Sequence, residues 1–116
     1  MFDSKQMLID SQTDVTGTVT GSALDFRGED MAELVYRILV PTATTGSMKV
    51  RIEQSEDGST NWTPIVESDT IDKAGVYHVH ARAKKRFRRA EITVNGAGNF
   101  GKVRVGTVPA GTYRDW

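Results

Sequence analysis

The chain has 116 residues, which corresponds to about one domain and leaves no room for a second full core. It contains no cysteine, which excludes a disulfide-stapled scaffold, a thiolate metal site and a cysteine nucleophile. Its 15 basic and 15 acidic side chains balance, and the longest uncharged stretch, residues 38–48, is too short to cross a membrane, so no membrane partner is expected.

The side-chain composition favours strands over helices. Threonine and valine number 13 and 12, whereas leucine, a strong helix former, numbers only 4. Stiff β-branched side chains suit pleated sheets, and the 11 glycines supply frequent turns. The composition therefore predicts an all-β fold.

The neutral total charge hides an uneven distribution. Residues 1–80 carry 6 basic and 13 acidic side chains, a net charge of −7, whereas residues 81–116 carry 9 and 2, a net charge of +7. Such a surface can meet a complementary neighbour, including another copy of the same chain.

The first third of the chain contains an arm, a weak strand and a strong strand. Residues 1–12 form an arm with an apolar centre, which we expect to be an edge strand or a docked segment. Residues 13–25 read as a strand weakened by glycine, and residues 26–32 as a loop. Residues 34–40 are largely apolar, are followed by a proline, and predict a central strand.

The middle of the chain predicts a hairpin. Residues 48–55 alternate strictly between apolar and polar side chains, so one face of this strand should contact solvent. The Asp57-Gly58 pair that follows is typical of a tight turn. Residues 61–68 predict the returning strand, which Pro64 confines to a sheet edge or a bulge.

The last third predicts three more strands. Residues 76–83 alternate, residues 84–89 form a basic turn, and residues 90–94 form a short strand. Residues 95–101 are rich in glycine and predict a hairpin loop rather than a phosphate cradle, because a strand and not a helix follows at residues 102–108.

Seven or eight short strands about ten residues apart predict an antiparallel β-sandwich of jelly-roll type. We divide the chain into an N-terminal arm at residues 1–12, a sandwich domain at residues 13–108 and a C-terminal tail at residues 109–116.

The sequence offers little for catalysis or metal binding. His78 and His80 lie two apart on a strand and share a face, but no spacing points to a third ligand. No G-x-S-x-G elbow is present, and the carboxylate pairs at residues 29–30 and 56–57 lie in apparent loops. We therefore expect no enzyme activity, no cofactor and no metal site.

The basic segment, residues 84–89, is the sharpest local feature. Three interpretations stay open: a solvated turn, a docking site for an acidic protein surface, and a phosphate-binding patch for nucleic acid. Phe87 is the only aromatic side chain among the cations, so few side chains could stack on bases. Nucleic-acid binding is therefore the least favoured of the three interpretations. The five cations are Lys84, Lys85, Arg86, Arg88 and Arg89.

Residues 54–62 combine a strand, a turn and an aromatic side chain that we expect to be buried. A similar pattern occurs in discoidin-type carbohydrate-binding jelly rolls. Sugar binding is therefore an alternative function, on analogy of fold alone.

The whole chain resembles the jelly-roll cement, or decoration, proteins of tailed bacteriophage capsids. The resemblance rests on four short motifs in order: the opening D-x-x-Q-x-L-x-D-S-Q at residues 3–12, Q-S-x-D-G at residues 54–58 with the following Trp62 and P-I, K-R-aromatic-x-R at residues 85–89, and G-x-V at residues 101–103. The basic segment has more cations than the usual pattern of these proteins.

The resemblance implies a structural virion protein on the outer surface of the capsid. Such proteins bind the major capsid protein and bridge neighbouring capsomers, often as homodimers and sometimes as trimers. We favour a homodimer here and expect no nucleic-acid partner. From exposure and charge, the residues predicted to contact the capsid or another copy are Phe2, Met7, Leu8, Lys84, Lys85, Arg86, Tyr113 and Trp116.

Overall fold

The fold is described from a computed structural model, which places residues 7–25, 33–82 and 85–108. These residues form nine strands and no helix, so none of them makes a helix that could cross a membrane. The strands are β1 (Met7–Asp10), β2 (Val19–Thr20), β3 (Leu24–Asp25), β4 (Glu33–Val40), β5 (Ser47–Ser55), β6 (Thr63–Glu67), β7 (Gly75–Arg82), β8 (Phe87–Asn95) and β9 (Arg104–Val108).

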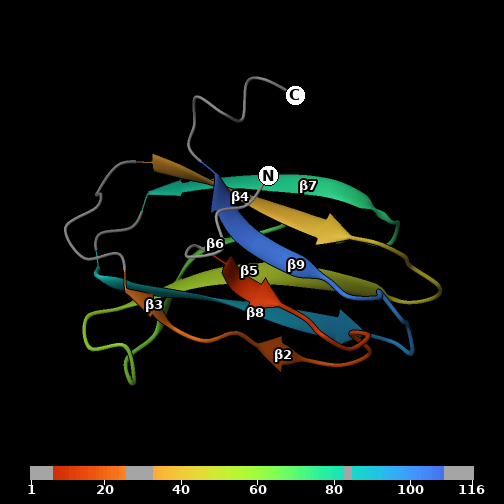
Figure 1. The fold of residues 1–116 in the computed structure, drawn as a ribbon, viewed down its shortest axis with the longest axis horizontal. Coiled ribbons are helices and arrows are strands. Elements are labelled where there is room, and N and C mark those ends of the chain that lie inside the picture. Colours follow the sequence, from red (N-terminus) through yellow and green to blue (C-terminus); the bar gives the residue numbers. More distant parts are fainter. Residues whose placement is uncertain (1–6, 26–32, 83–84, 109–116) are drawn as a thin grey trace.

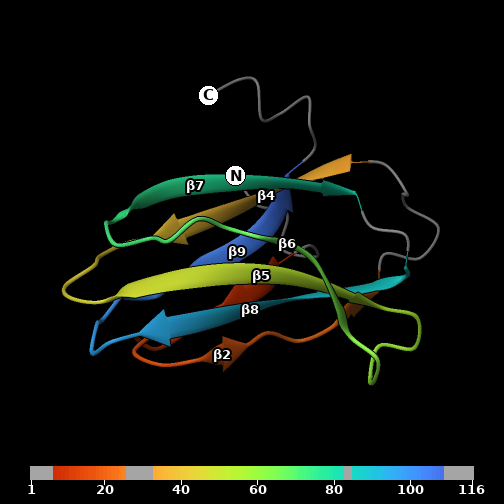
Figure 2. The ribbon, with the colours of Figure 1, turned by 180° about the vertical axis from the view of Figure 1, so that it is seen from behind.

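Two antiparallel sheets face each other (Figure 1). The first, called sheet A here, has the order β1-β9-β4-β7; the second, sheet B, has the order β2-β8-β5-β6, with β3 also paired to β8. This order, in which the chain repeatedly crosses between the sheets, is that of a jelly roll, and the predicted antiparallel sandwich is confirmed. Figure 2 shows the two layers from behind, with β6 and β7 at the same side of the sandwich.

The core lies between the sheets and follows from the period-two alternation of the strands. On β5, Met48, Val50 and Ile52 are buried, and their side chains meet the inward side chains of β4, β8 and β9. A single hydrophobic cluster results, which includes Leu8, Tyr36, Ile38, Ile92, Phe100, Val103 and Val105.

The weak strand expected over residues 13–25 is split into β2 and β3, which explains why there are nine strands rather than seven or eight. Gly21 lies between the two strands and donates its amide to the carbonyl of Ala90 at 2.8 Å. A Cβ on Gly21 would collide with the carbonyl oxygen of Leu8 and with a side-chain carbon of Ile9. Glycine is required here because the chain crosses so closely over β1.

The predicted hairpin of β5 and β6 is confirmed, and Gln54 pairs with Thr63 at its end. Asp57 holds the turn: its carboxylate accepts the amides of Ser59 and Thr60 at 3.0 and 2.9 Å. Gly58 has φ of 78°, the left-handed conformation that a side chain disfavours. Pro64 lies on the edge strand beside a bulge, as predicted.

The glycine-rich loop at residues 95–101 differs from the prediction, because it does not close a hairpin. The strand before it, β8, belongs to sheet B and pairs with β5, whereas β9 belongs to sheet A and pairs with β4 and β1. Phe100 is fully buried and anchors the crossing in the core, where its amide also bonds the carbonyl of Val15 at 2.9 Å. Burial of this aromatic side chain fixes the end of the loop in the core.

Candidate binding surface

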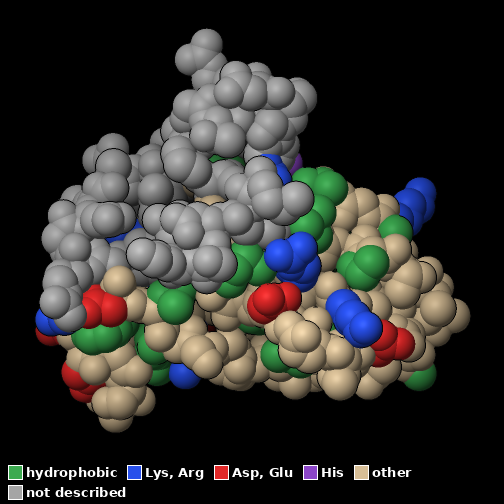
Figure 3. Space-filling view, viewed as in Figure 1, with side chains coloured by type: hydrophobic (Ala, Val, Ile, Leu, Met, Phe, Trp, Pro, Cys, Tyr) green, Lys and Arg blue, Asp and Glu red, His purple; other side chains and the backbone are tan. Residues whose placement is uncertain are grey.

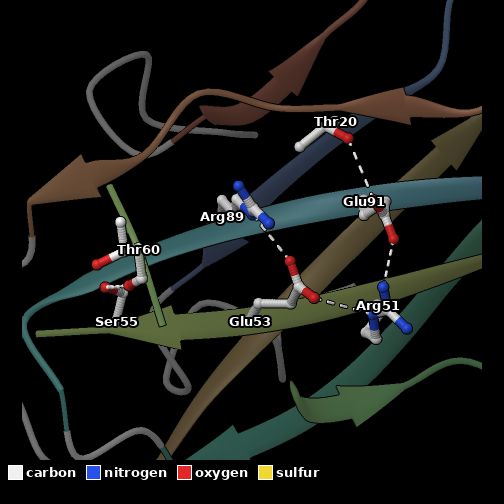
Figure 4. A network of polar contacts seen from close by, with 7 residues as sticks. All are labelled: Thr20, Arg51, Glu53, Ser55, Thr60, Arg89 and Glu91. Atoms are coloured by element: carbon white, nitrogen blue, oxygen red, sulfur yellow. Dashed lines mark hydrogen bonds and ion pairs between the residues drawn. The ribbon is translucent and has the colours of Figure 1, made fainter. Parts of the chain in front are cut away.

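The outer face of sheet B carries charges that neutralise one another (Figure 4). Glu53 lies on β5 between Arg51 and Arg89, with ion-pair distances of 3.1 and 2.8 Å to their Nε atoms. Arg51 also pairs with Glu91 on β8, whose other carboxylate oxygen accepts a hydrogen bond from Thr20 at 3.2 Å. Each charge therefore has its partner on the same face.

The basic segment is largely occupied by partners within the chain. Arg86 makes two hydrogen bonds to the carboxylate of Asp25, at 2.7 and 2.6 Å. Arg88 points inward, is 1% exposed, and lies 3.4 Å from the hydroxyl of Tyr36. Burial raises the pKa of that tyrosine, and the adjacent guanidinium opposes this rise.

Arg89 also has partners within the chain. Its Nε donates a hydrogen bond to Glu53, and its guanidinium carbon lies 4.3 Å from the centroid of the Trp62 ring. Trp62 itself is half-buried rather than fully buried. Arg86, Arg88 and Arg89, three of the five cations of the basic segment, thus have partners within the chain.

The outer face of sheet A has a different character, because apolar side chains lie on it. Val35 of β4 is 2% exposed and packs with Met7 of β1 and Leu39 in a cluster separate from the core. Val76 of β7, paired opposite Leu39, is 50% exposed and is the one strongly exposed large hydrophobic side chain among the described residues. A shallow cavity of about 450 Å³ runs beside it, lined by Leu39, Val40, Pro41, Ala74, Gly75, Val76, Lys102 and Arg104.

Cationic and imidazole groups accompany these apolar side chains. Lys102 and Arg104 flank the cavity, and Arg37 and His78 face outward between β4 and β7. Arg104 lies 3.6 Å from Asp10 of β1, with which it forms an ion pair. On the side of the molecule that Figure 3 shows, basic, acidic and hydrophobic side chains lie next to one another.

Burial has a clear effect on His78. It lowers the pKa of the imidazole, and the positive charges of Arg37 and His80 lower it further. Burial also lowers the pKa of Arg37. The two histidines share the outer face, as the sequence predicted, and within residues 7–25, 33–82 and 85–108 no group of three metal-ligating side chains forms around them or elsewhere.

The structure separates the predicted contact residues. Met7 is half-buried on the outer face of sheet A, whereas Leu8 is 2% exposed inside the core and offers no surface. Successive side chains of a strand point to opposite faces, so Met7 and Leu8 differ, and a bulge in β1 turns Ile9 inward as well. Lys85 donates its amide to Gln54 at 3.2 Å, and Arg86 is exposed but paired with Asp25.

Four predicted contact residues, Phe2, Lys84, Tyr113 and Trp116, lie outside the described residues. The surface of sheet A that forms around Val76, Lys102 and Arg104 was missed by sequence reasoning. The alternation of residues 76–83 indicated that one side of β7 faces outward, but not which neighbours would lie beside it.

Comparison with known proteins identifies the fold. No protein-family model and no curated protein sequence matches the chain. Among solved structures, the exported protein XepA of PBSX superposes with a TM-score of 0.65 and 14% identity over 90% of this chain, which spans 36% of XepA. PirA superposes with a TM-score of 0.51 and 13% identity, and the match covers 82% of this chain and 93% of PirA.

A two-module fragment of a Clostridium thermocellum xylanase, which contains a carbohydrate-binding module, superposes with a TM-score of 0.45 and 13% identity. The match covers 90% of this chain and 29% of the xylanase fragment. At these identities the likeness of XepA and PirA shows a shared β-sandwich fold.

Proposed function

We propose that this chain is a structural protein of a phage particle, which binds the major capsid protein on the outer surface of the capsid and stabilises the shell by bridging capsomers. The proposal rests on one observation above all: the outer face of sheet A combines exposed apolar area with cations, whereas the outer face of sheet B has satisfied its own charges. The face of sheet A is the binding surface.

The chemistry of that face defines its partner. Val76 and the adjacent cavity bury apolar area on contact, and Lys102 with Arg104 favour a partner that carries carboxylates. Sheet B offers less, since removing its paired charges from water would cost desolvation without new partners.

The phage setting is supported by the resemblance of four ordered motifs to capsid cement proteins. The similar structure of the PBSX exported protein XepA agrees with that setting at the level of the fold. A cement protein needs no reactive pocket, because many copies that each bind weakly can together hold a shell closed.

The experiment uses phage heads that lack the protein. We expect the purified chain to bind them and to raise the temperature at which they rupture. The variant Lys102→Glu should weaken binding about tenfold or more, because it places a like charge against an acidic partner.

The matched control is Lys49→Glu on the outer face of sheet B, where the exposed side chain makes only a 3.9 Å pair with Glu67. This control should leave binding within about twofold, since exposed pairs of this kind contribute little. Equal effects of the two variants on binding would exclude the proposed face. No gain in rupture temperature with the unaltered protein would exclude the proposed function.

Carbohydrate binding is the second candidate, because one cavity on the outer face of sheet B has suitable chemistry. The cavity measures about 560 Å³ and offers the hydroxyl, amide and charged groups of Thr70, Thr93, Asn95, Lys49 and Glu67. It lacks an aromatic lining, and Arg89 occupies the face of Trp62. Binding on a glycan array that Thr93→Ala and Asn95→Ala abolish would favour this candidate over capsid binding.

A further inference from the structure

The polar cavity on the outer face of sheet B has a wall that is anchored to β5. Where the chain leaves β6, Ser68 is buried and donates its amide to the carbonyl of Val50 at 2.8 Å, and its hydroxyl accepts the amide of Val50 at 3.0 Å. Three residues later, Ile71 exchanges two backbone hydrogen bonds with Met48, at 2.9 and 2.8 Å. Residues 69–70 are thus fixed at both ends beside β5, so the wall of the cavity is preformed.

Two strands supply the floor of the cavity from matched positions. Ser47 of β5 lies directly opposite Asn95 of β8, and Lys49 lies directly opposite Thr93. Directly opposed residues of an antiparallel pair hold their Cβ atoms roughly 4.5–5.5 Å apart. All four side chains line the cavity, and each of them can donate a hydrogen bond. The floor is therefore a small area that is rich in donors.

Most of these donors are available to a ligand. Among the residues that the structure describes, none makes a hydrogen bond with the side chain of Ser47, Thr93 or Asn95. Lys49 has a partner, but its Nζ lies 3.9 Å from a carboxylate oxygen of Glu67, and both side chains are about half exposed. An exposed pair of this kind contributes little, so a ligand can replace it at small cost.

The second cation of the lining is held more firmly. Arg51 forms ion pairs with Glu53 on its own strand and with Glu91 on β8 (Figure 4). Its charge is therefore already matched on the face of sheet B. Lys49 is the cation of this cavity that is best placed to receive a negative group.

The arrangement of the lining indicates the chemistry of the ligand. A carboxylate on the floor can accept charge-assisted hydrogen bonds from Lys49 and further ones from Thr93 and Asn95. Glu67 and Thr70 lie on the wall, where they can bind hydroxyl groups of the same ligand. The volume of about 560 Å³ lies within the range of roughly 300–1,000 Å³ that small-molecule sites have. A ligand that combines a carboxylate with neighbouring hydroxyl groups matches both parts of the cavity.

We propose that this cavity binds an acidic saccharide, whose uronate carboxylate contacts Lys49, Thr93 and Asn95 while its hydroxyl groups contact Glu67. The inference rests on the carbohydrate binding given above as the second candidate function, and it adds the class of sugar. Because no aromatic side chain is among the described lining residues, the charged contact and not ring stacking supplies the selectivity. The site lies on the layer opposite to sheet A (Figure 1), so it is separate from the face proposed for the capsid.

A titration of the full chain, followed by NMR of its backbone amides, tests the class of ligand. The probes are oligomers of galacturonate, glucuronate and mannuronate, each compared with its methyl ester, which keeps the hydroxyl groups and removes the charge. We expect at least one acid to bind about tenfold or more tightly than its ester and to shift the amide signals of Lys49, Thr93 and Asn95. Binding of the acid should weaken as salt screens the charges.

The outcomes separate this inference from the functions proposed above. Equal affinity for acids and esters would overturn the acidic class and leave carbohydrate binding in place. No binding of any probe would overturn both, and signal changes confined to sheet A would exclude this cavity. None of these results bears on the rupture temperature of phage heads, which tests capsid binding by itself.

Variants of the floor provide a matched comparison. Lys49→Gln should lower the affinity for the acid about tenfold or more and change that for the ester less than about twofold. Asn95→Asp keeps the shape of the side chain and should also weaken binding of the acid, because it places a like charge beside the carboxylate. Lys73→Gln removes an exposed lysine that is not part of the lining and should change either affinity less than about twofold. Equal losses in Lys49→Gln and Lys73→Gln would contradict a specific contact with Lys49.

Discussion

Glu53 and Arg89 occupy directly opposed positions on β5 and β8, and the carboxylate accepts a hydrogen bond from the guanidinium Nε at 2.8 Å. The glutamate is 5% exposed, so this pair is shielded from solvent more than an ordinary surface pair. Arg51 forms an ion pair with the same carboxylate, so Glu53 joins two guanidinium groups on this face.

Removing that carboxylate should destabilise the fold. We expect Glu53→Ala to lower the free energy of unfolding by about 1–3 kcal/mol, because Arg89 loses its hydrogen-bond acceptor and Arg51 loses an ion-pair partner. Urea denaturation measures the change, and a double-mutant cycle with Arg89→Ala should give a coupling energy above about 0.5 kcal/mol. The exposed pair of Lys49 and Glu67 is the control, and coupling there of the same size would contradict the special role of Glu53.

The turn at Asp57 should respond to acid. Hydrogen bonds from the amide and hydroxyl of Thr60 and the amide of Ser59 hold the pKa of the Asp57 carboxyl well below its usual range. Stability from the ionised carboxylate is complete above the ordinary aspartate pKa of about 4 and is lost as the pH falls below it.

Asp57→Ala should therefore lower the urea midpoint at pH 7, and this difference should shrink toward pH 3. Glu56→Ala, at the exposed neighbouring position, should change the midpoint little. Parallel pH profiles for the Asp57→Ala variant and the unaltered protein would show that the turn contributes no ionised-state stability.

His78 should oppose folding at mildly acidic pH. Since its pKa is lowered in the folded state, the unfolded chain takes up the proton first as the pH falls below the ordinary histidine value of about 6.5. The free energy of unfolding should accordingly decrease from pH 7.5 to pH 5.5, and His78→Gln should flatten this slope. Chemical denaturation at several pH values measures it, and an unchanged slope in the variant would assign the effect elsewhere.

Gly21 and Gly17 form a matched pair of glycines. Gly21→Ala should destabilise by about 1–3 kcal/mol, because the added carbon overlaps the backbone of β1. Gly17→Ala has nothing within 4 Å of the added carbon and should be neutral or slightly stabilising. Thermal unfolding of the two variants compares them, and similar midpoints would rule out close packing of this crossing.

The sequence by itself determined the local features of this protein. Period-two alternation identified the long strands and the inward side chains of β5, and Pro64 identified an edge strand with a bulge. The Asp57-Gly58 pair identified the turn between β5 and β6. These features depend on backbone preferences and on neighbours within a few residues, which a sequence displays directly.

Only the tertiary structure decided which charges have partners within the chain and where the proposed binding face lies. Arg86 and Arg89 find their partners 61 and 36 residues away, and Arg88 turns into the core because strand alternation places it on the inner side of β8. Sheet order likewise brought Val76 beside Leu39 and Lys102, and sent the glycine-rich loop across the sandwich. The reason is physical: pairing across strands depends on which segments become neighbours, and global burial of the core selects those neighbours.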